Sequence, residues 1–147
     1  MSYSLDQLIS IILAESERLE EQVKQKTDLQ NLTFKQLHAI EIIYKSGNPT
    51  LSELSGQLSI TKPSTTAMVD KLSEQGYIKK VKSDSDKRSA HLHLTQKGFH
   101  AAQLHERVHH DFADILTKEL SPSEKEIMLV LLNKAIKGII GKEKKVK

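Results

Sequence analysis

Residues 50–75 show the pattern of two helices joined by a tight turn, and this pattern constrains the fold more than any other feature. Thr50 and Glu53 form a capping box, in which each side chain satisfies a backbone N–H group that the first turn of a helix leaves unpaired. After a short turn, Thr61 can cap a second helix, and Gly76 provides the left-handed stop beyond its end. The order predicts a helix-turn-helix.

Two short strands are predicted after the second helix, at residues 77–82 and 89–94, with the polar loop 83–88 joining them as a wing. The second strand alternates apolar and polar residues, as a half-buried strand does. Between Thr61 and Gly98 there are eight Lys and Arg against four Asp and Glu, a net charge of +4, whereas the whole chain carries +3. This basic excess predicts a DNA-binding module. The alternative, a charged hairpin on an unrelated domain, is disfavoured because caps, turn and charge agree.

We expect the DNA contacts to come from the start and outward face of the second helix and from the wing. Short hydroxyls and lysines suit a helix that enters the major groove, where free backbone N–H groups also meet phosphate. The predicted contact residues are Thr61, Lys62, Ser64, Thr65, Thr66, Lys71, Lys82, Ser85, Lys87 and Arg88.

The rest of the chain is predicted to be helical, so the expected fold class is mainly α with a small β-wing. Helical patterns at about 4–28 and 96–141 flank the DNA-binding part at about 33–95. Their apolar surface exceeds what one module needs, which predicts a homodimer joined by N- and C-terminal helices. Such a dimer reads two half-sites roughly 34 Å apart on double-stranded DNA. The 147 residues then form one domain that ends in a basic tail at 142–147.

Composition narrows the function further. The chain has no cysteine, which excludes disulfides, thiolate metal ligands and cysteine nucleophiles. An apolar run long enough to cross a membrane and a signal-peptide pattern are both missing from the sequence, so we expect a soluble, cytoplasmic protein without a membrane partner. Neither a GxSxG motif nor a glycine-rich phosphate loop occurs. An interaction-only helical protein is disfavoured by the outward hydroxyls and lysines of the second helix.

One enzyme motif does occur. His105 and His109 flank Glu106 in an HExxH pattern, which in zinc proteases supplies two metal ligands and a general base. Such an enzyme needs a third downstream ligand and a substrate cleft, and no active-site strand or further domain precedes the motif. We therefore expect no catalytic residues and no enzymatic activity.

Four polar residues lie on apolar stripes of different predicted helices: Glu20, His38, His105 and His109. Unpaired charges inside a protein are costly, so these side chains need a partner. Three imidazole nitrogens and one carboxylate oxygen suit a tetrahedral zinc ion. Glu–His hydrogen bonds within the core, with Glu41 as a competing neighbour, explain the same residues without metal.

The order of elements, together with two stretches of sequence, resembles the MarR (multiple antibiotic resistance regulator) family of transcription factors. Asp86-Lys87-Arg88 followed by Leu92-His93-Leu94-Thr95-Gln96-Lys97-Gly98 is similar to that family's DxR…LxLTxxG signature, and residues 71–78 resemble its recognition-helix exit. The resemblance implies a homodimer on a pseudo-palindromic operator, usually a repressor released by a ligand. It also implies that Lys87 and Arg88 reach the minor groove or its phosphates while Asp86 braces an arginine.

Two branches of the family resemble the histidine-rich part of the chain, and they imply different effectors. The residues that match the main metal site of zinc-uptake repressors are Glu20, His38, His105 and His109. At the positions of those repressors' second metal site, this chain has Lys26, Leu37 and Leu104 instead. The stretch around His105 equally resembles repressors of fatty-acid synthesis genes, which respond to acylated carrier protein. Zinc is therefore one expected effector. The other expected effector is an acyl or aromatic ligand. In that case the protein represses lipid-synthesis or efflux genes, and its histidines are structural.

Overall fold

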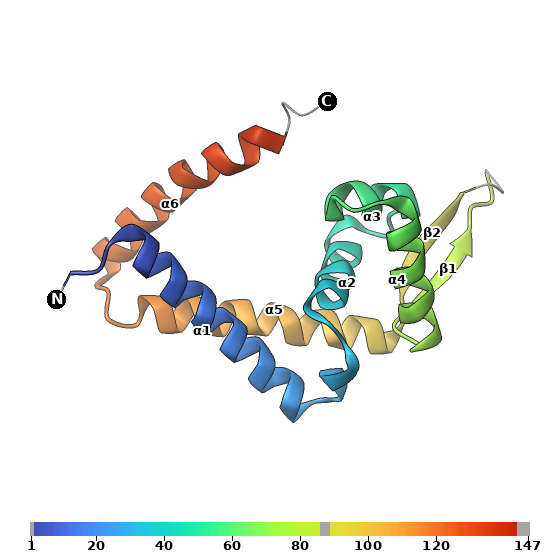
Figure 1. The fold of residues 1–147 in the computed structure, drawn as a ribbon, viewed down its shortest axis with the longest axis horizontal. Helices are drawn as coiled ribbons and strands as arrows, with labels where there is room; N and C mark the ends of the chain where they lie inside the picture. The colour runs from blue at the N-terminus through green and yellow to red at the C-terminus, as the bar shows by residue number, and fades with distance from the viewer. Residues whose placement is uncertain (1, 86–88, 144–147) are drawn as a thin grey trace. The chain divides into compact units, whose positions relative to one another are not determined.

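The computed structural model describes residues 2–85 and 89–143, with backbone only for 141–143. The elements in chain order are α1 (Leu5–Lys26), η1 (Asp28–Asn31), α2 (Phe34–Ser46), α3 (Leu51–Leu58), α4 (Lys62–Glu74), β1 (Ile78–Lys82), β2 (Ala90–Leu94), α5 (Gln96–Thr117) and α6 (Pro122–Glu143) (Figure 1). The expected fold class, mainly helical with a two-stranded wing, is confirmed. The described residues form two compact units, one up to His110 and one from Asp111 onward. The extent of a single domain over 1–147 stays a prediction.

The helix starts agree with the sequence signals because capping is local chemistry. The Thr50 hydroxyl accepts a hydrogen bond from the backbone N–H of Glu53 at 3.2 Å, and the Glu53 carboxylate accepts one from the backbone N–H of Thr50 at 2.7 Å. At the start of α4, the Thr61 hydroxyl accepts from the N–H of Ser64 at 3.3 Å. After α4, Gly76 adopts φ +80°, the left-handed conformation that a glycine adopts without strain.

The sequence patterns did not predict the short 3-10 turn η1 between α1 and α2. Thr27 caps it by accepting from the N–H of Leu29 at 3.3 Å. Leu29 and Leu32, at and just after this turn, are both 1% exposed. The turn therefore contributes two core side chains to the N-terminal unit.

Helix α2 lies at the centre of the N-terminal unit. Its apolar side chains from Leu37 to Ile43 are buried, as its nearly all-round apolar pattern predicts, whereas Phe34 at its start is 41% exposed. The core packed around it takes residues from η1, α3, α4, β1, β2 and α5 and from the positions next to them: Leu29, Leu32, Leu54, Val69, Leu72, Tyr77, Ile78, Leu92, Leu94, Ala101 and Ala102. Helices α3 and α4 are thus fixed to the core through their apolar faces, which leaves their other faces open to solvent.

The wing consists of β1 and β2, an antiparallel pair in which Ile78 lies opposite Leu94 and Lys82 opposite Ala90 (Figure 1). Its base is tied to the helix-turn-helix, since the backbone N–H of Leu92 donates to the carbonyl of Pro49 at 2.9 Å. The predicted wing-tip residues Asp86, Lys87 and Arg88 lie outside the described residues, as do positions 144–147 of the predicted basic tail.

A close backbone approach joins the exit of α4 to the start of α5. The Thr95 hydroxyl donates to the carbonyl of Gly76 at 2.6 Å and accepts from the backbone N–H of Gly98 at 3.1 Å. A Cβ atom built on Gly98 would lie 2.0 Å from the carbonyl oxygen of Tyr77. Only glycine fits there, which gives a physical reason for the LxLTxxG pattern at residues 92–98.

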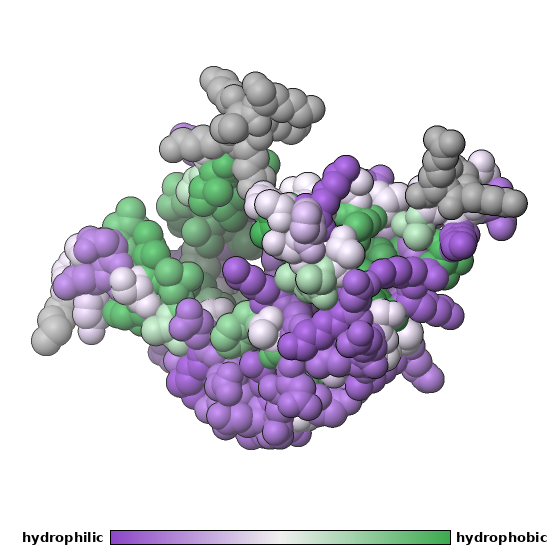
Figure 2. Space-filling model, turned by 45° about the vertical axis from the view of Figure 1, so that its right-hand side comes forward, coloured by the Kyte–Doolittle hydropathy of each residue, from purple (hydrophilic) through white to green (hydrophobic). Residues whose placement is uncertain are grey.

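Large hydrophobic side chains remain exposed on the helices near both ends of the chain, and such side chains gather in open patches on the surface (green in Figure 2). On α1 they are Leu5, Leu8, Ile9, Ile11 and Leu13, and on α6 they are Ile127, Leu129, Val130, Leu131, Leu132, Ile136, Ile139 and Ile140. Within residues 122–140 no side chain of α6 is buried. Among the helices described, none combines the length and apolar character that crossing a membrane requires.

Candidate nucleic-acid interface and carboxylate–imidazole cluster

The first turn of α4 presents a polar surface that its own capping bonds hold in place. Thr61, Lys62 and Ser64 are exposed, and the Thr61 hydroxyl donates to the Ser64 hydroxyl at 2.9 Å. The half-buried Thr66 donates its hydroxyl to the carbonyl of Lys62 at 2.9 Å, which leaves its oxygen able to accept. Hydroxyls and a lysine at a helix N-terminus form a surface that suits phosphate and base edges.

The outward position predicted for Thr65 is wrong. This side chain is 0% exposed, and its hydroxyl accepts from Ser55 at 2.8 Å and donates to the carbonyl of Thr61 at 2.9 Å. Thr65 lies four and seven residues before Val69 and Leu72, which are also buried, so all three share one helical stripe. The sequence contains that spacing, but the polar hydroxyl of Thr65 led to the prediction of an exposed position.

Further predicted contact residues lie along α4 and the wing. Lys71, Lys82 and Ser85 are exposed, as a DNA contact requires. Lys80 of β1, which was not predicted as a contact, forms an ion pair with Asp70 of α4 and thereby links the wing to this helix. The predicted contacts Lys87 and Arg88 lie outside the described residues. The described part of the candidate interface therefore consists of exposed residues of α4, of β1 and of the loop after β1.

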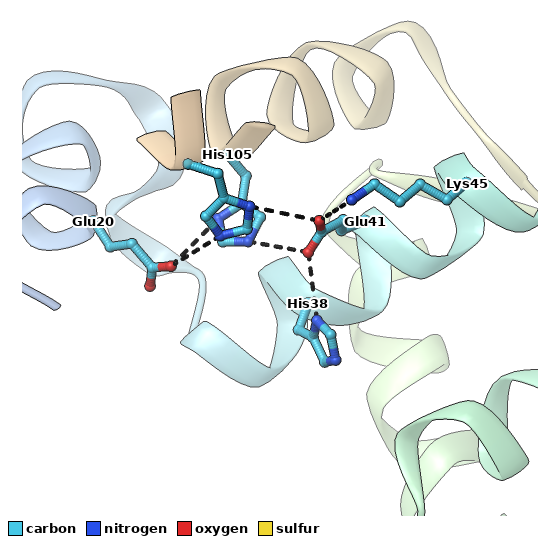
Figure 3. Close-up of polar contacts among 6 residues, drawn as sticks. Glu20, His38, Glu41, Lys45 and His105 are labelled. Carbon is cyan, nitrogen blue, oxygen red and sulfur yellow. Dashed lines mark hydrogen bonds and ion pairs between the residues drawn. The ribbon is translucent and has the colours of Figure 1, made fainter. Parts of the chain in front are cut away.

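A second group of polar side chains, the carboxylate–imidazole cluster, consists of Glu20 from α1, Glu41 from α2 and the pair His105 and His109 from α5. Figure 3 shows His105 between the two carboxylates. Nδ1 of His105 lies 3.8 Å from Glu20 Oε1, and its Nε2 lies 3.3 Å from Glu41 Oε2. For His109, Nε2 lies 3.8 Å from Glu20 and Nδ1 lies 3.7 Å from Glu41. Each imidazole thus turns one nitrogen to each carboxylate.

Burial and nearby charges shift the pKa values of two members of this cluster, Glu41 and His105. Burial opposes ionisation of Glu41, but the hydrogen bond and charge of Lys45, together with the electrostatic influence of the neighbouring imidazoles, outweigh it, so the pKa of this carboxyl lies below its ordinary value. Burial is also the largest influence on His105 and holds its pKa below the ordinary value, against the opposing effect of Glu20. A neutral His105 between carboxylates has the form that binds a metal ion.

The geometry fits a metal ion for three of the four predicted ligands. One ligand atom each from Glu20, His105 and His109 lies within 4.8 Å of the others. His38 is not part of this group, because its side chain is 58% exposed. Its Nδ1 lies 3.4 Å from Glu41, and this carboxylate stands between His38 and His105 (Figure 3). The set with His38 as fourth ligand is therefore not assembled in this structure.

Glu41, which the sequence offered as a competing partner for these histidines, lies next to both imidazoles. A histidine that binds a metal through one nitrogen usually donates the other N–H to a carboxylate, which fixes the ring and its tautomer. Glu41 lies at that position for both His105 and His109, and Lys45 in turn holds Glu41. Glu106 of the HExxH pattern is exposed.

Comparison with known proteins shows that the sequence is similar to those of helix-turn-helix transcriptional regulators. The MarR family profile matches residues 32–90. The chain is 30% identical over 96 residues to the uncharacterized HTH-type transcriptional regulator YkoM of Bacillus subtilis, covering 65% of this chain and 62% of that protein. It is 35% identical over 75 residues to the transcriptional repressor MprA of Escherichia coli K12, covering 51% of this chain and 43% of MprA. The chain thus spans less than two thirds of either relative.

The structural similarity extends over nearly the whole chain. The crystal structure of Streptococcus pneumoniae FabT in complex with DNA superposes with a TM-score of 0.84 at 27% identity, covering 93% of this chain and 96% of FabT. The superposed part of the chain therefore includes the helix-turn-helix, the wing and most of the flanking helices. The chain is thus similar to MarR-family regulators, in sequence over residues 32–90 and in fold over nearly its whole length.

Proposed function

We propose that the protein is a homodimeric, sequence-specific DNA-binding transcriptional regulator that acts as a repressor. The observation that carries this proposal is the exposed first turn of α4, where Thr61, Lys62 and Ser64 stand free of the core beside a basic wing. The likeness to FabT in a complex with DNA, and to a protein named as a repressor, supports the same function.

Dimerisation is proposed because the apolar faces of α1 and α6 need a cover. Exposed patches this extensive are unusual on a monomer and mark a protein interface. Two copies related by a two-fold axis bury the same patch on each chain and present two α4 helices to two half-sites. The operator is then a pseudo-palindrome.

A DNA selection tests this function. Random duplexes enriched on the purified protein should yield a two-fold symmetric sequence, bound by Lys62→Ala and Ser64→Ala variants more weakly than by the wild type. Lys118→Ala, which removes an exposed lysine just beyond the C-terminal end of α5, is the matched control and should bind normally. Failure to enrich any sequence, or equal losses in the control, contradicts the proposal.

A divalent metal, most simply zinc, is the effector that the cluster geometry favours. Glu20, His105 and His109 would be its protein ligands, and Glu41 would orient both imidazoles. Binding would fasten α1 to α5 and, through Glu41, to α2. It would favour one spacing of the two α4 helices and so act as a co-repressor. An acyl or aromatic ligand is the alternative, with the cluster then a structural hydrogen-bonding group.

Metal analysis distinguishes the metal effector from the acyl or aromatic ligand. After dialysis against buffered zinc, the wild type should retain about one ion per chain, as a three-ligand protein site with one exchangeable position does. Glu20→Gln and His109→Asn should lose it. His38→Ala is the matched control, because His38 lies outside the ligand group. No retained zinc, or the same loss in His38→Ala, contradicts a metal site built on these three residues.

A further inference from the structure

A chain of buried hydroxyl groups connects α3 to the start of α4. Ser55 Oγ donates to Thr65 Oγ1 at 2.8 Å, and Thr65 Oγ1 donates to the carbonyl oxygen of Thr61 at 2.9 Å. Ser55 is 6% exposed and Thr65 is 0% exposed. Hydrogen bonds in series polarise one another, and those inside a protein are stronger than those in water. The connection between the two helices is therefore directional as well as apolar.

The hydroxyl chain ends on the residue that begins the candidate DNA surface. Thr61 is the N-cap of α4. Its hydroxyl donates to the Ser64 hydroxyl and accepts from the Ser64 backbone N–H. Ser55 also holds the turn between the helices, because its carbonyl accepts from the N–H of Ile60 at 3.3 Å. That turn passes through Ser59 at φ +53°, a left-handed conformation that a residue with a side chain adopts at a cost. Ser55 thus fixes the turn with its backbone and the next helix with its side chain.

We infer that Ser55 and Thr65 are positioning residues for sequence recognition, acting through Thr61 on the orientation of the first turn of α4. The inference rests on the proposed DNA-binding function and assigns to two buried hydroxyls a share of its specificity. Hydrogen bonds to base edges are directional and specify sequence, whereas contacts to phosphates position the protein without reading sequence. A small loss of orientation at α4 therefore weakens binding to the correct sequence more than binding to any other.

Stability alone does not require this pair of hydroxyls. Replacing both members of a buried hydrogen bond with apolar groups of similar shape is nearly neutral, whereas removing one member leaves the other unsatisfied. In the double variant Ser55→Ala/Thr65→Val the Thr61 carbonyl keeps its bond from the Thr65 backbone N–H, at 3.0 Å. The double variant should thus be about as stable as the wild type while lacking the directional link.

The experiment measures the affinity ratio between an operator duplex, selected with the wild type, and a scrambled duplex of equal length at one salt concentration. We expect Ser55→Ala/Thr65→Val to lower this ratio about five- to tenfold, the equivalent of one hydrogen bond, with affinity for the scrambled duplex unchanged. Thr65→Ser, which keeps the hydroxyl, should retain the wild-type ratio. Ile43→Val, which removes a methylene from the core at α2, is the control for general loosening and should leave the ratio unchanged.

Different results would overturn the proposed function and the positioning role. A wild type that shows no preference for any duplex overturns the proposed function, and the positioning role with it. A wild type that prefers its operator, together with a stable double variant that keeps the full ratio, overturns the positioning role alone. If the single variant Thr65→Val does not fold, the double variant and Thr65→Ser still decide the matter.

Discussion

Replacing Gly98 with alanine tests whether the close approach between α5 and the end of α4 stabilises the fold. The added Cβ would lie 2.0 Å from the Tyr77 carbonyl oxygen and 3.1 Å from a methyl carbon of Leu94. Real Cβ atoms essentially never approach another heavy atom closer than 3.0 Å. The start of α5 therefore has to move away from Tyr77 by about 1 Å, the difference between these two distances.

The cost follows from what that shift disturbs. Overpacking of a tight contact costs about 1–3 kcal/mol, and a backbone carbonyl that cannot turn aside places this site at the upper end. The hydrogen bond from the Thr95 N–H to the Tyr77 carbonyl, 3.0 Å long, lies at the same contact, and its loss adds about 1 kcal/mol. The higher helix propensity of alanine returns about 1 kcal/mol. Gly98→Ala should therefore lower the free energy of unfolding by about 3 kcal/mol.

Urea denaturation, followed by circular dichroism at a fixed chain concentration, measures this change, since the stability of a dimer depends on concentration. Gly56→Ala is the matched control, because Gly56 lies on the exposed face of α3 with nothing within 4 Å of a built Cβ. It should raise the free energy of unfolding by about 0.5–1 kcal/mol. A Gly98→Ala protein as stable as the wild type would show that the close approach at Tyr77 does not constrain this position.

Three further predictions follow from the described residues. In zinc-free protein, burial holds the pKa of His105 below 6.5, so the unfolded chain binds this proton more tightly. The free energy of unfolding should then decrease as pH falls below about 6.5, and urea titrations of His105→Gln should show a flatter pH profile. Lys71→Ala should reduce the slope of log affinity for DNA against log salt concentration by about 1, measured by fluorescence anisotropy, whereas an unchanged slope excludes a phosphate contact. Gly76→Ala, at φ +80°, should cost about 1–2 kcal/mol of stability in the same urea assay, and a neutral result would exclude strain there.

Local chemistry made the helix boundaries predictable from the sequence. The capping box at Thr50 and the left-handed Gly76 depend on residues within a few positions of each other, so their spacing determines the structure. The wing likewise follows from alternation along 89–94. Where a signal lies within one element, the residues alone contain it.

The arrangement of the cluster depends on packing between helices and could not be predicted in this way. His38 and Glu41 are three residues apart on α2 and share a face of that helix. The rotation and separation of α2 relative to α5 decide which of them meets His105, and no pattern within α2 records these quantities. The structure selects Glu41, whose carboxylate lies 3.3 Å from His105, and leaves His38 exposed. Sequence periodicity correctly placed His105 on an inward face, but it was wrong for His38 and His109, whose side chains are 58% and 47% exposed.

Thr65 illustrates a different limit. Hydroxyl side chains occur on both buried and exposed faces, so their polarity does not tell which face they occupy. Inside the protein the Thr65 hydroxyl has two partners, Ser55 across the helix pair and the carbonyl of Thr61 within its own helix.

The unburied state of α6 has a consequence for how the protein responds to its own abundance. A helix of 22 residues that buries none of its described side chains is marginally stable by itself in water. If its order comes from a second copy, dilution unravels α6 before it affects the helix-turn-helix. While single chains predominate, mass action makes the paired form rise with the square of their concentration. Occupancy of a two-half-site operator would then switch over a narrower range of protein synthesis than one chain binding alone allows.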